Sequence, residues 1–254
     1  MTIKAITFDF WFTLYDSPTL DYARPLGNVK AAIERHSRTN IEVGQFEVAV
    51  EIARSCWSRA WLEERRTIPA AEWLRLILAE LAIPLEPEHL ADCQLALEQS
   101  IFTNPPTPVP DARAILAELS ARYRLAVISD TGLTPGRVLR QILARDGLSD
   151  YFAQLTFSDE VGQSKPHHDI FLVTLKALGV EPEQAVHVGD LLHSDIIGAH
   201  GVGMRAIQYV GLRPAGHIAP ENLHEAKVKP DGMIKNFSEL KLWLQQWPKQ
   251  SASR

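Results

Sequence analysis

Six short apolar runs separated by helical patterns are the feature that most constrains the fold of this chain. The runs are rich in β-branched and aromatic residues, as buried strands are. Strands that alternate with helices predict parallel βαβ units, and therefore an α/β fold built on a parallel sheet. The predicted strands are Ile3–Phe8, Arg124–Ser129, Gln154–Ser158, Ala185–Val188, Arg205–Val210 and Gly232–Lys235. The predicted helices are Ala112–Arg122, a helix with Thr134 as N-cap and Pro135 as first residue that ends near Arg145, Ile170–Leu178, Asp195–His200 and Ser238–Trp247.

The stretch from about residue 16 to residue 108 interrupts this alternation. It contains no convincing strand, whereas its apolar residues recur at helical spacing, for example at Trp73, Leu74, Ile77 and Leu78. The proline-rich segment 104–110 suits neither a helix nor a central strand and is typical of a stiff linker. We therefore expect an all-helical module at residues 15–108, inserted into a domain formed by residues 1–14 and 109–254.

The composition is that of an ordinary globular chain and argues against several functional classes. With 254 residues, 46% of them hydrophobic and 22% charged, the chain can form one large or two modest domains. A net charge of −5, with no basic face or tail, argues against a nucleic-acid partner. The apolar run at the N-terminus is short and carries Asp9, so we expect neither a signal peptide nor a membrane span. Cys56 and Cys93 lack metal-ligand spacing and suit buried thiols, which fits a reduced, cytoplasmic setting.

Four short segments, far apart in the sequence, carry the residues best suited to chemistry. Asp9, Ser129 and Asp190 stand at or just past the end of a predicted strand, and Lys165 follows a loop after another. Ligands in open α/β sheets bind outside the carboxyl ends of the strands, so we expect these side chains to converge on one crevice. Carboxylates, a hydroxyl and a lysine together predict a site for an anionic substrate beside a divalent cation.

The order and spacing of these segments resemble the haloacid dehalogenase (HAD) superfamily, most of whose members are phosphatases. The matching segments are residues 8–13 (FDFWFT), 128–130 (ISD), 164–166 (SKP) and 189–195 (GDLLHSD), and the last continues into the most specific match of the chain. The resemblance covers the first 14 residues and nearly all of residues 109–246, whereas residues 15–108 fit it only in length and helical character. It implies a Rossmann-like core with an inserted helical cap of the C1 type that closes over the site.

The resemblance implies a role for each residue of the first three segments. Asp9 would be the nucleophile that forms a covalent intermediate, and Lys165 would neutralise both this carboxylate and the substrate anion. Thr13 and Ser129 would hydrogen-bond the substrate's oxygens. Asp130, which we place with the substrate-binding residues, either carries an acid/base role or caps its loop. Each residue also has a purely structural alternative, such as an acceptor at a strand end or the hydroxyl of a turn.

Magnesium is the cofactor that the resemblance implies. Asp190 would bind the ion directly, and Asp195 would act through water or fix Lys165. Asp9 and the backbone carbonyl of Trp11 would complete the ligand set.

Trp11 is the main departure from the family pattern. The phosphatases usually carry a second aspartate at this position as general acid/base, and such assistance is typically worth about 10²–10⁴-fold in rate. Tryptophan cannot transfer a proton. Histidine is the side chain best suited to proton transfer at physiological pH, so His167 or His168 either replaces this acid or faces water as a loop residue. The structural alternative for Trp11 itself is a hydrophobic plug under the cap.

We predict a magnesium-dependent phosphatase that acts on a small phosphorylated metabolite through an aspartyl-phosphate on Asp9. The dehalogenase branch of the family is one alternative, because it also lacks the second aspartate. That branch, however, has tyrosine at the position of Phe171, and serine and asparagine at the positions of Asp190 and Leu192. Another alternative is a catalytically impaired protein that binds a phosphorylated ligand.

In the family that the chain resembles, the cap usually sets the substrate specificity. Arg54, Arg59 and Trp57 either line a pocket or face water and the core. The stripe positions favour a core location for most of the tryptophans of this region, which include Trp61 and Trp73.

Overall fold

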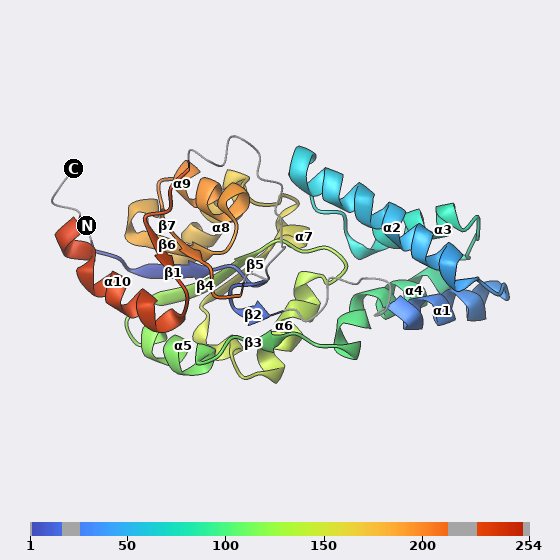
Figure 1. Cartoon of the computed structure of the whole chain (residues 1–254), viewed down its shortest axis with the longest axis horizontal. Helices are drawn as coiled ribbons and strands as arrows, with labels where there is room; N and C mark the ends of the chain where they lie inside the picture. The colour runs from blue at the N-terminus through green and yellow to red at the C-terminus, as the bar shows by residue number, and fades with distance from the viewer. Residues whose placement is uncertain (1, 17–25, 213–227, 251–254) are drawn as a thin grey trace.

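The computed structural model describes residues 2–16, 26–212 and 228–250. Parts of the predicted helical module (15–108) and of the predicted domain formed by 1–14 and 109–254 therefore lie outside the described residues. Its centre is a six-stranded, all-parallel sheet with the strand order β5-β4-β1-β6-β7-β8 (Figure 1). The strands are β1 (Ala5–Phe8), β4 (Arg124–Ser129), β5 (Gln154–Phe157), β6 (Ala185–Gly189), β7 (Arg205–Tyr209) and β8 (Gly232–Ile234). The chain leaves β1 toward β4 and β5, then crosses back to β6, so the strand order reverses beside β1.

Helices cover both faces of this sheet, and alternate residues of each strand sort between the faces. Large residues such as Ile6 and Phe8 pack against α5 (Ala112–Ser120), α6 (Gly136–Arg145) and α10 (Phe237–Gln250). Small residues such as Ala5 and Ala126 face α8 (His168–Leu178) and α9 (Ile197–Gly201) on the other side (Figure 1). The shorter helices α7 (Ser158–Val161), η4 (Ser149–Tyr151) and η5 (Pro182–Gln184) lie in the connections.

The inserted segment forms a separate group of helices at one end of the molecule (Figure 1). The helices are α1 (Gly27–Ser37), α2 (Val43–Arg59), α3 (Ala70–Glu80) and α4 (Pro87–Glu98), with a π-helical turn η2 (Ala60–Glu64) and a 3-10 helix η3 (Gln99–Thr103). They bury a hydrophobic cluster of their own around Ile33, Trp73 and Ile77, which also takes in Leu133 from the loop after β4. The predicted fold class, a parallel sheet flanked by helices with an inserted helical module, is confirmed.

The prediction that this stretch contains no strand is wrong at its two ends. Residues Tyr15–Asp16 form β2, which pairs in antiparallel fashion with β3 (Thr107–Pro108) outside the main sheet. The proline of this pair lies in a short two-stranded ladder rather than in a central strand, as its missing N–H requires. The ladder brings the entry to the insertion and the exit from it side by side.

Two predicted helix starts differ from the structure. Helix α6 begins at Gly136, with Pro135 as its N-cap, because the carboxylate of Asp159 accepts the Gly136 N–H at 3.1 Å and replaces the predicted Thr134 cap. The segment predicted as a helix from Asp195 opens as a π-helical turn, η6 (Leu192–Ile196), before α9. The first difference arises from a tertiary contact of a carboxylate, which a local pattern does not contain.

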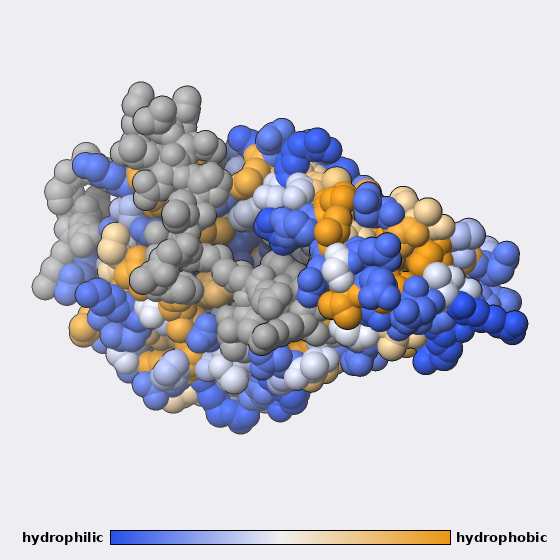
Figure 2. Space-filling model, turned by 45° about the vertical axis from the view of Figure 1, so that its right-hand side comes forward, coloured by the Kyte–Doolittle hydropathy of each residue, from blue (hydrophilic) through white to orange (hydrophobic). Residues whose placement is uncertain are grey.

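The cysteines agree with the prediction, since both are free thiols; Cys93 is buried and Cys56 is half-buried. Exposed apolar side chains occur on the helical module, where Val43 and Val48 of α2 are 62% and 55% exposed. Figure 2 shows hydrophobic residues at this end of the molecule mixed with hydrophilic ones. Scattered exposure of this kind is normal on protein surfaces. Within the described parts of the chain, no helix combines the length and the apolar character that crossing a membrane demands.

Candidate active site

The site lies at the carboxyl ends of the central strands, next to the point where the strand order reverses. Asp9 follows β1 and Asp190 follows β6, the two neighbouring strands on either side of this reversal. The Asp9 N–H donates to the carbonyl of Val188 at 2.8 Å, which extends the ladder by one residue. This is the position at which open α/β sheets bind their ligands.

Three buried carboxylates meet there. Asp9, Asp190 and Asp195 each offer an oxygen, and these oxygens lie within 4.8 Å of one another. Their residues are 5%, 3% and 0% exposed. Burial of three carboxylates in one place is costly unless cations compensate them, so this cluster is a candidate site for a divalent ion.

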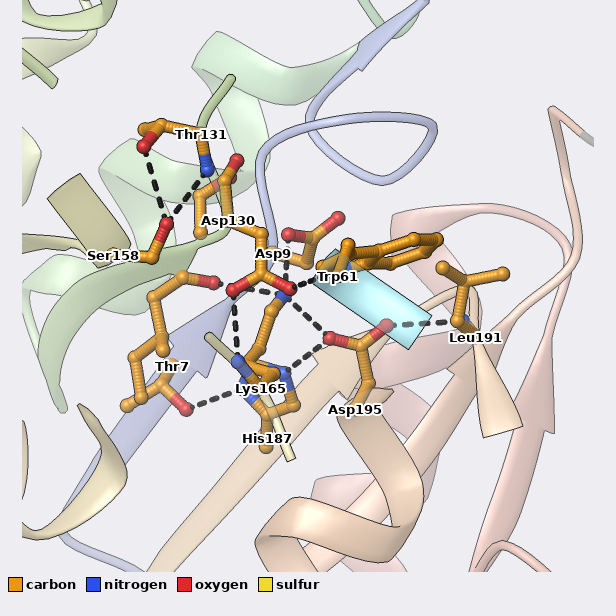
Figure 3. A network of polar contacts seen from close by, with 12 residues as sticks. Thr7, Asp9, Trp61, Asp130, Thr131, Ser158, Lys165, His187, Leu191 and Asp195 are labelled. Atoms are coloured by element: carbon orange, nitrogen blue, oxygen red, sulfur yellow. Dashed lines mark hydrogen bonds and ion pairs between the residues drawn. The ribbon is translucent and has the colours of Figure 1, made fainter. Parts of the chain in front are cut away.

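Lys165 supplies one compensating charge. Its Nζ donates to Asp9 Oδ1 at 2.6 Å and to Asp195 Oδ1 at 2.6 Å (Figure 3). It also donates to the carbonyl of Ile128 at 3.2 Å. These three acceptors use all three protons of the ammonium group. The side chain is only 3% exposed, so the lysine is a fixed part of the cluster rather than a surface residue.

A second set of hydrogen bonds, from His187 and from the backbone of Leu191, fixes the carboxylate of Asp195. Oδ1 accepts from His187 Nε2 at 3.1 Å, and Oδ2 accepts from the Leu191 N–H at 2.9 Å (Figure 3). A carboxylate only accepts, so the proton lies on Nε2 and the Nδ1 atom of His187 accepts from Thr7 Oγ1 at 2.8 Å. Of the two roles predicted for Asp195, direct contact with Lys165 is the one that the structure displays.

These contacts split the pKa values of the two carboxylates that share Lys165. Burial raises the pKa of Asp9 to about 7, although the charge of Lys165 opposes the shift. Burial also acts on Asp195, but there the charge of Lys165 and the donated hydrogen bonds hold the pKa well below its usual range. Burial by itself would lower the pKa of Lys165, yet the surrounding carboxylates raise this pKa above its ordinary value. Burial lowers the pKa of His187, which leaves a neutral imidazole.

Asp130 joins the core to the helical module. Its Oδ1 accepts the Lys165 backbone N–H at 2.8 Å, and its Oδ2 accepts Nε1–H of Trp61 at 2.8 Å (Figure 3). Burial raises the pKa of Asp130, while Lys165 opposes the shift. Since each oxygen already accepts a hydrogen bond, the geometry suits an acceptor that holds its loop better than a mobile acid.

The predicted hydroxyl residues both lie in the buried region around the strand ends. The Ser129 hydroxyl donates to the carbonyl of Asp130 at 3.1 Å. Thr13 is fully buried, and its Oγ1 has no hydrogen-bond partner among the described residues. An unsatisfied buried hydroxyl costs free energy, so Thr13 Oγ1 is available to a ligand.

Trp11 lies beside the site but packs into the sheet's hydrophobic cluster. Its ring contacts the edge of Phe10, with ring centroids 4.9 Å apart, and Trp11 forms a backbone bridge to Tyr15. Phe12, the residue after Trp11, has a left-handed backbone with φ of 55°. The side chain thus fills an apolar place, whereas the expected role of its carbonyl as a metal ligand stays a prediction.

The two loop histidines are not brought to the carboxylates. His167 caps α8, where its Nδ1 accepts the Asp169 N–H at 3.3 Å. His168 is exposed and lies close to Gly201. The surroundings of both residues fit the loop interpretation rather than the replacement of the missing acid.

Three further residues belong to the site. His187 was not predicted, Trp61 was named as lining a pocket or lying in the core with the core favoured, and His193 lies within the predicted segment 189–195 without an assigned role. His187 is a polar residue inside an apolar strand run, which is the one sequence signal that marks it. Trp61 was expected in the core; it instead stacks on Trp57, with centroids 5.5 Å apart, and contacts the edge of His193 at 5.2 Å. Of the three tryptophans of the helical module, only Trp73 is fully buried, at 1% exposure.

Two arginines of the module pair with acidic residues of the module itself: Arg54 with Glu51, and Arg66 with Glu72 at 3.1 Å. Arg59, the other arginine named above, is exposed.

Comparison with known proteins agrees with this geometry. A family model described as a hydrolase, haloacid dehalogenase-like hydrolase, matches residues 3–203. A glyceraldehyde 3-phosphate phosphatase of Pyrococcus abyssi is 35% identical over 213 residues, which cover 82% of this chain and 81% of that protein.

Solved structures share the fold over almost the whole chain. The 2-haloacid dehalogenase of Pseudomonas syringae pv. Tomato DC3000 has a TM-score of 0.67 at 26% identity and covers 97% of this chain and 100% of its own. The magnesium-bound structure of YfnB from Bacillus subtilis has a TM-score of 0.62 at 16% identity, with 96% and 99% covered. Because the family model matches most of this chain, the chain belongs to the haloacid dehalogenase-like hydrolases.

Proposed function

We propose that this hydrolase is a magnesium-dependent phosphatase that cleaves a small phosphorylated metabolite through an aspartyl-phosphate on Asp9. The observation that carries the proposal is the buried cluster in which Lys165 bridges Asp9 and Asp195, with a third carboxylate, Asp190, within 4.8 Å. The phosphatase name of the relative from Pyrococcus abyssi points the same way.

The chemistry follows from the position of Asp9. Its free carboxylate oxygen attacks the phosphorus atom, and the bond between phosphorus and the ester oxygen breaks as the aspartyl-phosphate forms. Water then attacks the phosphorus of this intermediate, releases phosphate and regenerates the carboxylate. Lys165 neutralises the carboxylate that it touches and the phosphoryl oxygens, while Thr13 and Ser129 orient those oxygens.

The residues present fit a magnesium ion. Three carboxylate oxygens within 4.8 Å are the hard donors that this ion selects, and it commonly uses one or two carboxylates together with substrate and water. We assign Asp9, Asp190 and the Trp11 carbonyl as direct ligands. Asp195, whose oxygens accept from Lys165, His187 and the Leu191 N–H, acts by holding Lys165 and through water. Once bound, the ion would neutralise the phosphoryl charge.

The helical segment 15–108 is proposed to be the cap of this site, and residues 1–14 and 109–254 its catalytic domain. Trp61 of this segment already contacts Asp130 at the site. No described side chain replaces the acid that Trp11 lacks, so we propose that leaving groups of low basicity react best.

A dehalogenase remains a second candidate, because the Pseudomonas syringae enzyme shares the fold at 26% identity. Two observations disfavour it. Phe171, which takes the place of that branch's tyrosine, is fully buried against His187 and has no hydroxyl. Asp190 adds a buried negative charge that displacement of a halide from an anionic substrate does not use.

The test measures phosphate release from glyceraldehyde 3-phosphate and other small phosphate esters, with Mg²⁺ or with a chelator. We expect turnover that needs Mg²⁺ and disappears in Asp9→Asn. Asp111→Asn is the matched control, since Asp111 is exposed and has a left-handed backbone that asparagine tolerates. Metal-free halide release from a 2-haloacid without phosphate release would overturn the proposal in favour of a dehalogenase.

A further inference from the structure

The segment Trp61–Thr67 of the helical module contacts Ser164, the residue before Lys165, and Asp130, whose carboxylate accepts the Lys165 N–H. We propose that Trp61 and Thr67 are positioning residues that set the loop carrying Lys165, so that docking of the module places this ammonium group between Asp9 and Asp195. The proposal rests on the proposed function in so far as Lys165 serves the reaction.

Trp61 acts through Asp130. Its Nε1–H donates to Asp130 Oδ2 at 2.8 Å, and Asp130 Oδ1 accepts the Lys165 backbone N–H at 2.8 Å (Figure 3). One carboxylate therefore links an indole of the module to the backbone of the lysine. If the module moves away, Asp130 loses one of its two donors in a buried place, which removes an interaction with a charged acceptor.

Thr67 acts through Ser164, the residue before the lysine. Its Oγ1 lies 2.8 Å from Ser164 Oγ and 2.5 Å from Ser158 Oγ, and the Ser164 N–H donates to the carbonyl of Arg65 at 3.0 Å. Thr67, Ser158 and Ser164 are 7%, 0% and 0% exposed. Water thus does not replace these contacts while the module is docked, and the loop is held by its backbone and by a side chain.

The local backbone explains why this segment reaches the core. Helix α2 runs into the π-helical turn η2, and the N–H groups of Arg65 and Arg66 both return to the carbonyl of Ala60. Arg65 then has a left-handed backbone with φ of 54°, which reverses the chain. π-Helical turns often occur at functional sites, and here the turn places Trp61 and Thr67 on the same side of the module as the Lys165 loop.

Trp57 provides a matched control for Trp61. The two indoles stack, and both belong to the module. The Trp57 Nε1 atom, however, is buried without a hydrogen-bond partner among the described residues, so replacement by phenylalanine removes ring size but no hydrogen bond. A difference between Trp61→Phe and Trp57→Phe therefore reports the bond to Asp130.

The first readout does not depend on activity. Protein labelled with ¹⁵N-lysine gives the hydrogen-exchange rate of the Lys165 amide by NMR. We expect Trp61→Phe and Thr67→Val to accelerate this exchange about tenfold, the effect of losing a hydrogen bond that holds the loop. Trp57→Phe and the hydroxyl-retaining Thr67→Ser should leave it within about twofold of the wild type. Equal exchange in Trp61→Phe and Trp57→Phe overturns the proposal, whether or not the protein is a phosphatase.

The second readout is kinetic. Misplacement of Lys165 should lower kcat about tenfold in Trp61→Phe while KM changes much less, because the group acts on the reacting atoms. Loss of folded protein would also lower the apparent kcat at constant KM, so kcat is referred to the folded fraction measured in the same samples. Thr67→Ser should restore the rate lost in Thr67→Val. A changed KM with unchanged kcat would make Trp61 a substrate contact instead and would overturn the positioning role.

Discussion

Replacement of Asp9 by asparagine should stabilise the metal-free protein while it abolishes the proposed reaction. Asp9 is 5% exposed, and Lys165, its nearest cation, is shared with Asp195. A carboxylate kept ionised in such a place is held against its own desolvation. Asparagine keeps the shape of the side chain and removes the charge. Active-site groups often lower the stability of the fold, so removing such a group often stabilises it.

The magnitude follows from the pKa. Burial raises the pKa of Asp9 from 3.8 to about 7, which corresponds to a free energy of about 4 kcal/mol between the two protonation states. Because the folded-state pKa lies above the unfolded one, the folded protein binds this proton more tightly. The stability of the wild type therefore falls as the pH rises from about 4 to 7 and levels off above 7. Asp9→Asn lacks this loss, so its advantage grows over the same range toward about 4 kcal/mol, the upper limit.

The assay is urea unfolding with a chelator at pH 5 and pH 8. Asp231→Asn is a control of opposite sign, because hydrogen bonds from His200, Ala206 and Arg205 hold the pKa of Asp231 well below its usual range despite its burial. Asp231 stabilises the fold above about pH 4 and loses this effect as the pH falls, so Asp231→Asn should be less stable than the wild type at pH 8. The reasoning fails if Asp9→Asn shows the same stability difference from the wild type at both pH values.

Three other outcomes are expected. Asp190→Ala should weaken Mg²⁺ binding strongly in calorimetric titration, because it removes a direct ligand; equal binding by both proteins would contradict the assigned site. Trp11→Asp should raise kcat/KM for alkyl phosphates more than for aryl phosphates, since alkoxides need protonation more; an unchanged ratio would show that acid assistance comes from elsewhere. Trp73→Ala should lower the free energy of unfolding by about 3–5 kcal/mol in urea, because the indole is 1% exposed; a loss below about 1 kcal/mol would mean that its surroundings collapse onto the cavity.

The strands of the sheet were predictable because their signal is local. Each predicted strand overlaps an observed one, and the errors are one or two residues at the ends, as at Ile3 and Val210. Such ends depend on pairing, since a residue counts as strand only where its neighbour strand reaches. The short strand at Tyr15 was missed because two residues carry no periodicity, and its partner contains a proline.

The convergence of the charged side chains was also predictable, because the carboxyl ends of parallel strands meet at one edge of the sheet. Asp9, Lys165, Asp190 and Asp195 lie together as the pattern of the chain indicated. The contact from Trp61 to Asp130 was not predictable, because 69 residues separate the two and a helical stripe gives no information on how the module sits on the sheet. The stripe put Trp61 in the core, whereas the π-helical turn rotates the chain away from regular helical spacing.

The charge of the cluster is the strongest argument about its chemistry. Three carboxylates face one ammonium group, so the ionised site repels any anion, whether a phosphate ester or a haloacid. A divalent cation among Asp9, Asp190 and Asp195 would balance the excess charge and make room for a phosphoryl group. The third carboxylate, Asp190, thus opposes binding of an anionic substrate without metal and favours it with metal. The proposed magnesium-dependent phosphatase makes use of every charge in this cluster, whereas a metal-free dehalogenase would have no use for the negative charge of Asp190.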